Sequence, residues 1–249
     1  MGLPRAMAVT GVTVTSIGNL ESYGLMNQME KENLRDRAID TFRHIYGQAV
    51  GTGLVAEYIG QTGLDVLNGA DILSGVANQY NSSVEYGNNA IAKNLRDVAR
   101  IHLANLGTRI FYTQHGGYDT HSNEMLAHLK LMTELSGAIS DFMDDLEEHN
   151  ASGNVTIFVF TEFGRRMRDN GSGTDHGTAG GAFIFGENVL GGLYGEYPSL
   201  DPKDWVHGED LSHTIDFRSV YSTLLEQWMN VEAKPIVKGD YEQLFPFRR

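Results

Sequence analysis

Three short polar clusters, each beside an apolar run, hold the residues of this chain that could do chemistry. Each combines carboxylate or imidazole side chains with a glycine, and the clusters span residues 116–121, 161–165 and 173–177. Carboxylates and imidazoles at strand ends, with glycines that allow sharp turns, are typical of metal sites at the carboxyl edge of an α/β sheet. A metal-dependent enzyme is therefore the leading hypothesis.

The first cluster places Asp119 and His121 two residues apart, after a β-branched run. In an extended turn both side chains can converge on one point. A carboxylate with an imidazole suits Zn, Mn or Fe, and the carboxylate alone could also take Ca or Mg. The alternative is that Asp119 or Thr120 caps a helix that begins near Glu124. The spacing by itself favours neither interpretation.

The second cluster follows the most β-like run of the chain, residues 155–160. Glu162 at the end of this run could be a metal ligand or a general base. Arg165 and Arg166 could clamp an anionic ester oxygen. An ordinary ion pair between Glu162 and an arginine at the sheet edge is the alternative, and it is favoured when the cluster is taken alone.

The third cluster lies in a glycine-rich loop that contains Asp175 and His176. His176 could bind a metal with the Asp175 carboxylate beside it. Such a loop is equally typical of an ordinary surface turn. Taken together, the clusters give Asp119, His121, Asp175 and His176 as candidate metal ligands, and Glu162 and Arg165 as candidate catalytic residues.

The elements that must position these residues alternate between helix and strand in the second half of the chain. Periodicity predicts helices over residues 29–46, 53–80, 88–106, 124–149 and 217–229, and strands over 9–14, 108–113, 155–160 and 182–185. The strand–helix–strand unit from 108 to 160 implies neighbouring parallel strands. We expect a single α/β domain over residues 1–249, with few strands for its length.

Composition excludes several classes of protein. A net charge of -13 argues against nucleic acid as a partner, because phosphate binding needs clustered Lys and Arg. The chain has no cysteine, so thiolate metal sites, cysteine nucleophiles and disulfides are excluded. No run approaches the roughly 18 apolar residues of a transmembrane helix. No export signal is visible in the chain as given.

The order of the motifs adds a family resemblance. Residues 113–121, with Gly116-Gly117-Tyr118-Asp119-Thr120-His121, resemble the Gly-Gly-Trp-Asp-Thr-His signature of the bacterial family called domain of unknown function 1501. The later blocks follow in the same order: Thr161-Glu162-Phe163-Gly164-Arg165, Gly173-Thr174-Asp175-His176-Gly177, Gly191-Gly192-Leu193-Tyr194-Gly195 and Asp216-Phe217-Arg218.

The resemblance implies membership of the alkaline phosphatase and sulfatase superfamily, whose sheet is flanked by helices and carries divalent ions at its carboxyl edge. Asp119 and His121 then look like one Asp/His ligand pair, and His176 looks like the late histidine ligand. Glu162 then lies at the end of a strand, where relatives have an Asp-His pair. The implied function is hydrolysis of phosphate or sulfate esters, on a small molecule or a glycan, with Zn, Mn, Ca or Mg. A periplasmic or exported location is implied as well.

Two departures from the family pattern bear on activity. Phe163 stands where an Asp-His site would place its histidine, which argues against a second metal. Family members usually carry a longer N-terminal portion, with a twin-arginine signal and a Ser-His-Phe segment expected to hold the nucleophile or another ligand. We therefore expect an alkaline-phosphatase-like sheet that is incomplete on its N-terminal side. The alternative function is a non-catalytic metal- or ligand-binding α/β module.

Overall fold

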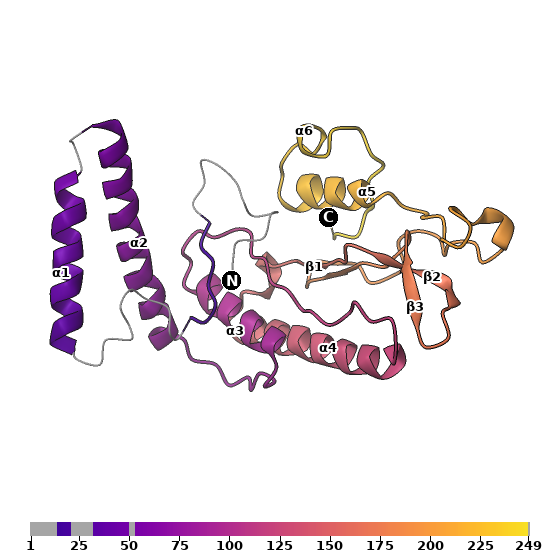
Figure 1. Ribbon diagram of the computed structural model, residues 1–249, viewed down its shortest axis with the longest axis horizontal. Coiled ribbons are helices and arrows are strands. Elements are labelled where there is room, and N and C mark those ends of the chain that lie inside the picture. Colours follow the sequence, from indigo (N-terminus) through magenta and orange to yellow (C-terminus); the bar gives the residue numbers. More distant parts are fainter. Residues whose placement is uncertain (1–13, 21–31, 50–52, 249) are drawn as a thin grey trace. The chain divides into compact units, whose positions relative to one another are not determined.

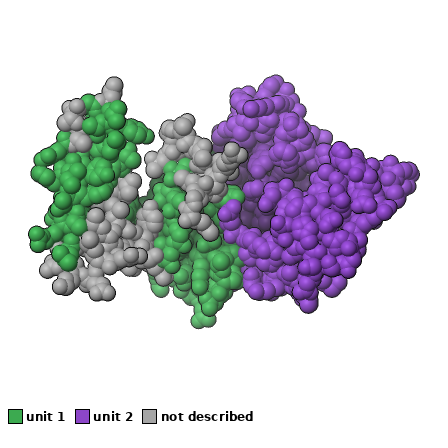
Figure 2. All heavy atoms as spheres, in the orientation of Figure 1, with its two compact units in different colours: residues 1–113 green, residues 114–249 purple. Residues whose placement is uncertain are grey.

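The computed structural model describes residues 14–20, 32–49 and 53–248. Backbone contacts divide the chain into two compact units, residues 1–113 and 114–249, which Figure 2 shows in two colours. Each unit is described by itself below. The chain combines α-helices with small antiparallel sheets, so the expected mixture of α and β structure is found. The single domain over residues 1–249 stays a prediction.

The first unit contains three of the predicted helices, α1 (Glu32–Ala49), α2 (Leu54–Gln79) and α3 (Ala90–Leu103) (Figure 1). α1 packs against α2, and α2 contacts α3. α3 begins at Asn89, whose side-chain oxygen accepts a hydrogen bond from the Ala92 N–H at 2.9 Å. This bond satisfies one of the free donors at the helix start and fixes where the helix begins.

The core of the first unit forms around Leu20, Leu73, Val76 and Ile101. Phe111 packs against this cluster, yet the predicted strand over residues 108–113 is not a strand. β propensity reflects packing and pairing with a neighbour, and no described strand pairs with this segment. The strand predicted over residues 9–14 lies outside the described residues except for Val14, which is not in a strand.

The second unit is built on α4 (Glu124–Glu148), which confirms the predicted helix. Its buried face includes Ala138, Ile139, Phe142 and Leu146 near the carboxyl end. Asn150, in the left-handed conformation at a φ of 55°, follows the helix. The turn η2 (Ser152–Asn154) then leads into the first strand.

The sheets of the second unit are two antiparallel pairs, which corrects the prediction of parallel neighbours. β1 (Ile157–Val159) pairs with β4 (Phe183–Phe185), and β2 (Gly164–Asp169) pairs with β3 (Thr174–Gly177). β1 and β4 lie within predicted strands, whereas the β2–β3 hairpin lies where the sequence indicated a loop. The parallel arrangement required residues 108–113 as the partner strand of a right-handed crossover, and that segment forms no strand.

The remaining elements follow β4. They are η3 (Pro202–Asp204), α5 (Phe217–Thr223), the π-helical turn η4 (Leu224–Trp228) and α6 (Lys234–Val237). α5 and η4 together cover the predicted helix over residues 217–229. Tyr221 of α5 packs edge-to-face on Phe158 of β1, with ring centroids 5.7 Å apart. This contact joins the C-terminal helices to the β1–β4 pair.

None of the helices in the described ranges is both long and apolar enough to span a bilayer.

Asp216 at the start of α5 yields a prediction about acid stability. Its carboxylate accepts hydrogen bonds from the Arg218 side chain and backbone, which lower the pKa of Asp216 to about 2. A carboxyl with a depressed pKa stabilises the folded state above its ordinary pKa near 4, and this contribution disappears as the pH falls towards 2.

We expect Asp216→Asn, which keeps an acceptor oxygen for the cap, to lower the unfolding free energy by about 0.5–1 kcal/mol at pH 7. Urea unfolding followed by circular dichroism from pH 2 to pH 7 measures this difference. The difference should vanish at the acid end, and a difference that stays constant across the range would contradict the prediction.

Candidate metal centre

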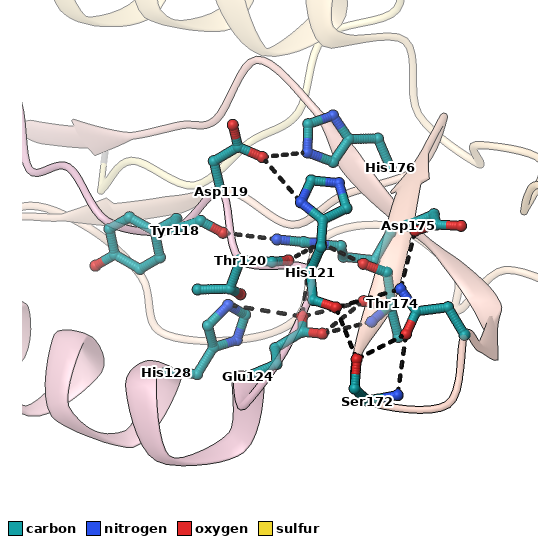
Figure 3. Close-up of polar contacts among 12 residues, drawn as sticks. Tyr118, Asp119, Thr120, His121, Glu124, His128, Ser172, Thr174, Asp175 and His176 are labelled. Atoms are coloured by element: carbon teal, nitrogen blue, oxygen red, sulfur yellow. Dashed lines mark hydrogen bonds and ion pairs between the residues drawn. The ribbon is translucent and has the colours of Figure 1, made fainter.

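Asp119, His121 and His176 are the predicted ligands that the structure brings together (Figure 3). Asp119 Oδ1 lies 2.7 Å from His176 Nε2 and 3.6 Å from His121 Nδ1. One ligand atom from each of the three residues lies within 4.8 Å of the others. All three side chains are exposed, with Asp119 at 68%, so the cluster opens to solvent.

Two segments supply these side chains. Asp119 and His121 come from the irregular segment before α4, and His176 comes from β3. The Thr120 N–H donates to the Tyr118 carbonyl at 2.8 Å, which tightens the first segment between the two ligands. The N-cap position of α4 is Asn123, so neither Asp119 nor Thr120 caps the helix. The helix-capping interpretation of this cluster is therefore wrong.

Asp175 lies outside the cluster although the sequence grouped it with the ligands. Its Oδ1 accepts a hydrogen bond from Asn170 Nδ2 at 3.0 Å. Successive side chains of a strand point to opposite faces, so Asp175 points away from the face that carries Thr174 and His176. Its role as a ligand stays a prediction that this geometry does not favour.

The glycine-rich loop of the third cluster forms the turn between β2 and β3 and holds the backbone of His121. Ser172 Oγ and Asn170 Nδ2 both donate to the His121 carbonyl, at 3.2 and 3.3 Å. The Asn123 N–H in turn donates to the Ser172 carbonyl at 3.0 Å. These bonds hold the backbone of the candidate ligand His121 against the turn of the hairpin.

Arg165 on β2 connects the two segments through its guanidinium group. Nη1 donates to the carbonyl oxygens of Thr120 and Thr174, and Nη2 donates to that of Tyr118, each at 2.6 Å. Nε lies 3.5 Å from Glu124 Oε1. The catalytic role predicted for Arg165 is untested, and this geometry gives it the role of holding the ligand segment against the hairpin.

Glu124 completes this connection from the first turn of α4, and the sequence analysis treated it only as a helix boundary. Its carboxylate accepts hydrogen bonds from the Thr174 N–H at 2.7 Å and from Thr174 Oγ1 at 2.9 Å. Burial on its own raises the pKa of the Glu124 carboxyl. The hydrogen bonds from Thr174, with the positive charge of Arg165, outweigh burial and place this pKa below its usual range.

Glu162 and Phe163 border the cluster. Glu162 is exposed and has no ion pair or hydrogen bond among the described residues, so the predicted Glu–Arg ion pair is not formed there. Phe163 stacks on the His176 imidazole, with ring centroids 3.9 Å apart and an interplanar angle of 9°. The stacking restricts the rotation of His176 and leaves its Nε2 directed at Asp119.

Gly164 and Gly177 face one another at the start of the hairpin. A Cβ added to Gly164 would lie 1.9 Å from the Ala179 carbonyl oxygen, and one added to Gly177 would lie 2.6 Å from the Arg165 carbonyl carbon. Only glycine fits where backbones approach this closely. The glycines of the motifs therefore permit the packing that brings His176 to Asp119.

A second polar group lies between the ligand segment and α4. Tyr118 Oη lies 2.9 Å from His115 Nδ1, and His115 Nε2 lies 3.4 Å from Glu134 Oε2. Burial raises the pKa of Tyr118, and the negative charge of Glu134 raises it further. The hydroxyl of Tyr118 is therefore a hydrogen-bond donor at neutral pH.

The donor set of the cluster fits a divalent transition metal. One carboxylate oxygen and two imidazole nitrogens match the ligand types that bind zinc in three-residue catalytic sites. Imidazole suits Zn and Fe, whereas Mn, Ca and Mg prefer oxygen ligands, of which the Asp119 carboxylate is one. Among the described residues, this is the one group of three or more such side chains that are close enough to share an ion.

Comparison with known proteins gives one family. The model of the family described as protein of unknown function (DUF1501) matches residues 21–238. Neither the curated proteins nor the solved structures give a match.

The contact at Gly164 predicts a strong effect of a single methyl group. We expect Gly164→Ala to lower the free energy of unfolding by about 2–3 kcal/mol, because the added Cβ meets a backbone carbonyl that must move. The matched control is Gly181→Ala, which adds a Cβ with no neighbour within 4 Å and should change stability by less than about 0.5 kcal/mol. Equal unfolding midpoints for the two variants in urea would contradict the prediction.

The contact between Glu124 and Thr174 predicts that the Glu124 carboxylate is protonated only at a lower pH than is usual for a glutamate. Because the pKa of Glu124 is lowered, the charged contact persists below the ordinary glutamate value of about 4.3 and is lost only at more acid pH. The Thr174 amide proton shift, followed by NMR, should change with a midpoint below that value, and Glu124→Gln should remove the change. A midpoint at or above about 4.3 would show that the contact does not stabilise the carboxylate.

Proposed function

We propose that this chain, which belongs to the family of proteins of unknown function DUF1501, binds a divalent metal ion and hydrolyses phosphate or sulfate esters. The observation that carries the proposal is the convergence of Asp119, His121 and His176, whose ligand atoms lie within 4.8 Å of one another. Asp119 and His176 are 57 residues apart in the sequence, so local structure alone does not account for their contact.

The donor set favours Zn over Ca or Mg, and its carboxylate also admits Mn. Two of the three donors are imidazoles, which hard cations with oxygen ligands rarely use. Three protein ligands in an exposed cluster leave further coordination positions open to water and to a substrate oxygen. When bound, such an ion supplies Lewis-acid stabilisation of an ester oxygen and activation of a water molecule.

The side chains around the donors hold them in place. Phe163 keeps the ring of His176 in one plane by stacking, and Arg165 fixes the backbone on both sides of Asp119. Loss of a group that orients a metal ligand typically lowers metal affinity by about 10- to 100-fold. Glu162, exposed and next to Phe163, is the carboxylate that we assign as a candidate general base.

Two arguments support the choice of ester hydrolysis. The order of the motifs along the chain resembles that of the DUF1501 family, and this resemblance implies a place in the alkaline phosphatase and sulfatase superfamily. Carboxylate and imidazole ligands with open coordination positions are also typical of the metal sites of hydrolases. The alkaline-phosphatase-like sheet is part of this proposal.

The alternative is a metal-binding module without turnover, and one observation favours it. The guanidinium of Arg165 donates to three carbonyl oxygens and lies beside Glu124, so it has little capacity left to clamp an anionic ester.

Metal binding and turnover together test the proposal. Chain purified without chelators is titrated with Zn²⁺ and with Mn²⁺ by calorimetry, and then assayed with chromogenic phosphate and sulfate esters. We expect one ion per chain, and we expect His176→Ala to weaken binding by at least about tenfold and to abolish turnover. The control is His44→Ala, which removes an exposed histidine of α1 and should change neither quantity.

The possible outcomes separate the two functions. Binding with ester turnover that His176→Ala removes supports the hydrolase. Binding without turnover of either ester supports the non-catalytic module, and no binding of either ion rejects both.

A further inference from the structure

A chain of hydrogen bonds runs from the ligand segment to the middle of α4. Tyr118 Oη lies 2.9 Å from His115 Nδ1 and 3.5 Å from the Leu131 carbonyl oxygen. His115 Nε2 lies 3.4 Å from Glu134 Oε2. The rings of His115 and Tyr118 meet edge-to-face, with centroids 5.3 Å apart.

The proton positions on His115 decide how these bonds are shared. With a proton on Nε2 alone, His115 donates to the Glu134 carboxylate and accepts from the Tyr118 hydroxyl at Nδ1; with a proton on Nδ1, the hydroxyl donates to the Leu131 carbonyl oxygen instead. The side chain of His115 is 12% exposed and that of Glu134 is 27% exposed. Hydrogen bonds are stronger away from bulk water, and each member of a connected chain strengthens the next.

This chain of bonds matters for the metal donors because Tyr118 lies between two glycines and Asp119 in the sequence. Gly116 and Gly117 come directly before Tyr118, and Gly117 has a φ of 102°. Two consecutive glycines leave the backbone with many alternative conformations, so ordering this stretch costs more entropy than elsewhere. Asp119 follows Tyr118 at once, so whatever fixes Tyr118 also fixes the first metal donor.

Tyr118 is held from two directions. Its side chain bonds to His115 next to α4, and its carbonyl oxygen accepts from Arg165 Nη2 at 2.6 Å. The carbonyl bond orients the peptide towards Asp119, and the hydroxyl bond holds the ring against His115. Removing the hydroxyl leaves the carbonyl bond to Arg165.

We propose that His115, Tyr118 and Glu134 form an anchor that positions Asp119 and thereby sets the metal affinity of the cluster. This inference rests on the proposed metal site and assigns Tyr118 as a positioning residue. Its hydroxyl contacts His115 and the Leu131 carbonyl and none of the three candidate ligands.

The test removes one oxygen atom at a time. Tyr118→Phe deletes the hydroxyl and keeps the ring. Tyr194→Phe is the matched control, because the hydroxyl of this half-buried tyrosine donates to the Leu190 carbonyl at 3.0 Å and belongs to neither the anchor nor the cluster. Co²⁺ binding is measured from the visible absorption of the bound ion, and exchange of the Thr120 amide hydrogen is measured without metal.

We expect Tyr118→Phe to weaken Co²⁺ binding by about tenfold with unchanged stoichiometry, as is usual when a group that orients a ligand is lost. We also expect faster exchange at the Thr120 amide, which bonds to the Tyr118 carbonyl in the folded segment. Glu134→Gln, which keeps an acceptor oxygen, should retain most of the affinity, whereas Glu134→Ala should not. Tyr194→Phe should resemble the unaltered chain in both measurements.

The two readouts separate the anchor from the metal site. Unchanged exchange and unchanged affinity in Tyr118→Phe overturn the anchor. If the unaltered chain binds no Co²⁺, the proposed function fails, and the exchange rate of Thr120 alone decides whether the anchor exists. Faster exchange with unchanged affinity overturns the inference that the anchor sets metal binding.

Discussion

The candidate site depends on the hydrogen bonds that the guanidinium group of Arg165 donates. Its three hydrogen bonds join the carbonyl oxygens of Tyr118 and Thr120 to that of Thr174 on the neighbouring strand. Hydrogen bonds to a charged group contribute roughly 1.5–3 kcal/mol each, and the side chain is only 19% exposed. A planar group with two terminal nitrogens is also needed, since in a lysine all three carbonyl oxygens would have to lie around a single ammonium nitrogen.

The helices of the chain could be predicted because their signal is local. Apolar residues at helical spacing located α1 to α4 to within a few residues, and the only irregularity in the last predicted helix is the π-helical turn after Thr223. Strands depend on a partner that the sequence does not name. Residues 108–113 have the composition of a strand and form none, whereas Gly164–Asp169, with three arginines, forms one. Gly164–Asp169 forms a strand because it pairs with β3 across the hairpin, although its composition is not typical of a strand.

The candidate site was predicted in part for the same reason. Asp119, His121 and His176 could be selected by residue type and spacing, but their convergence required the fold of the hairpin. Alternation along β3 could have separated Asp175 from His176, had the segment been recognised as a strand. The contribution of Glu124 could not be predicted, because a glutamate in the first turn of a helix is ordinary and its bond to Thr174 crosses 50 residues.

The separation of Asp119 and His176 along the chain has a mechanical consequence. An ion held by both residues would close a loop across 57 positions, and in a chain without cysteine it would act as the cross-link that a disulfide provides elsewhere. A ligand that binds only the folded state stabilises it by about 2.7 kcal/mol when present at 100 times its Kd. The resistance of this unit to heat and to proteases would then follow the supply of metal in its surroundings.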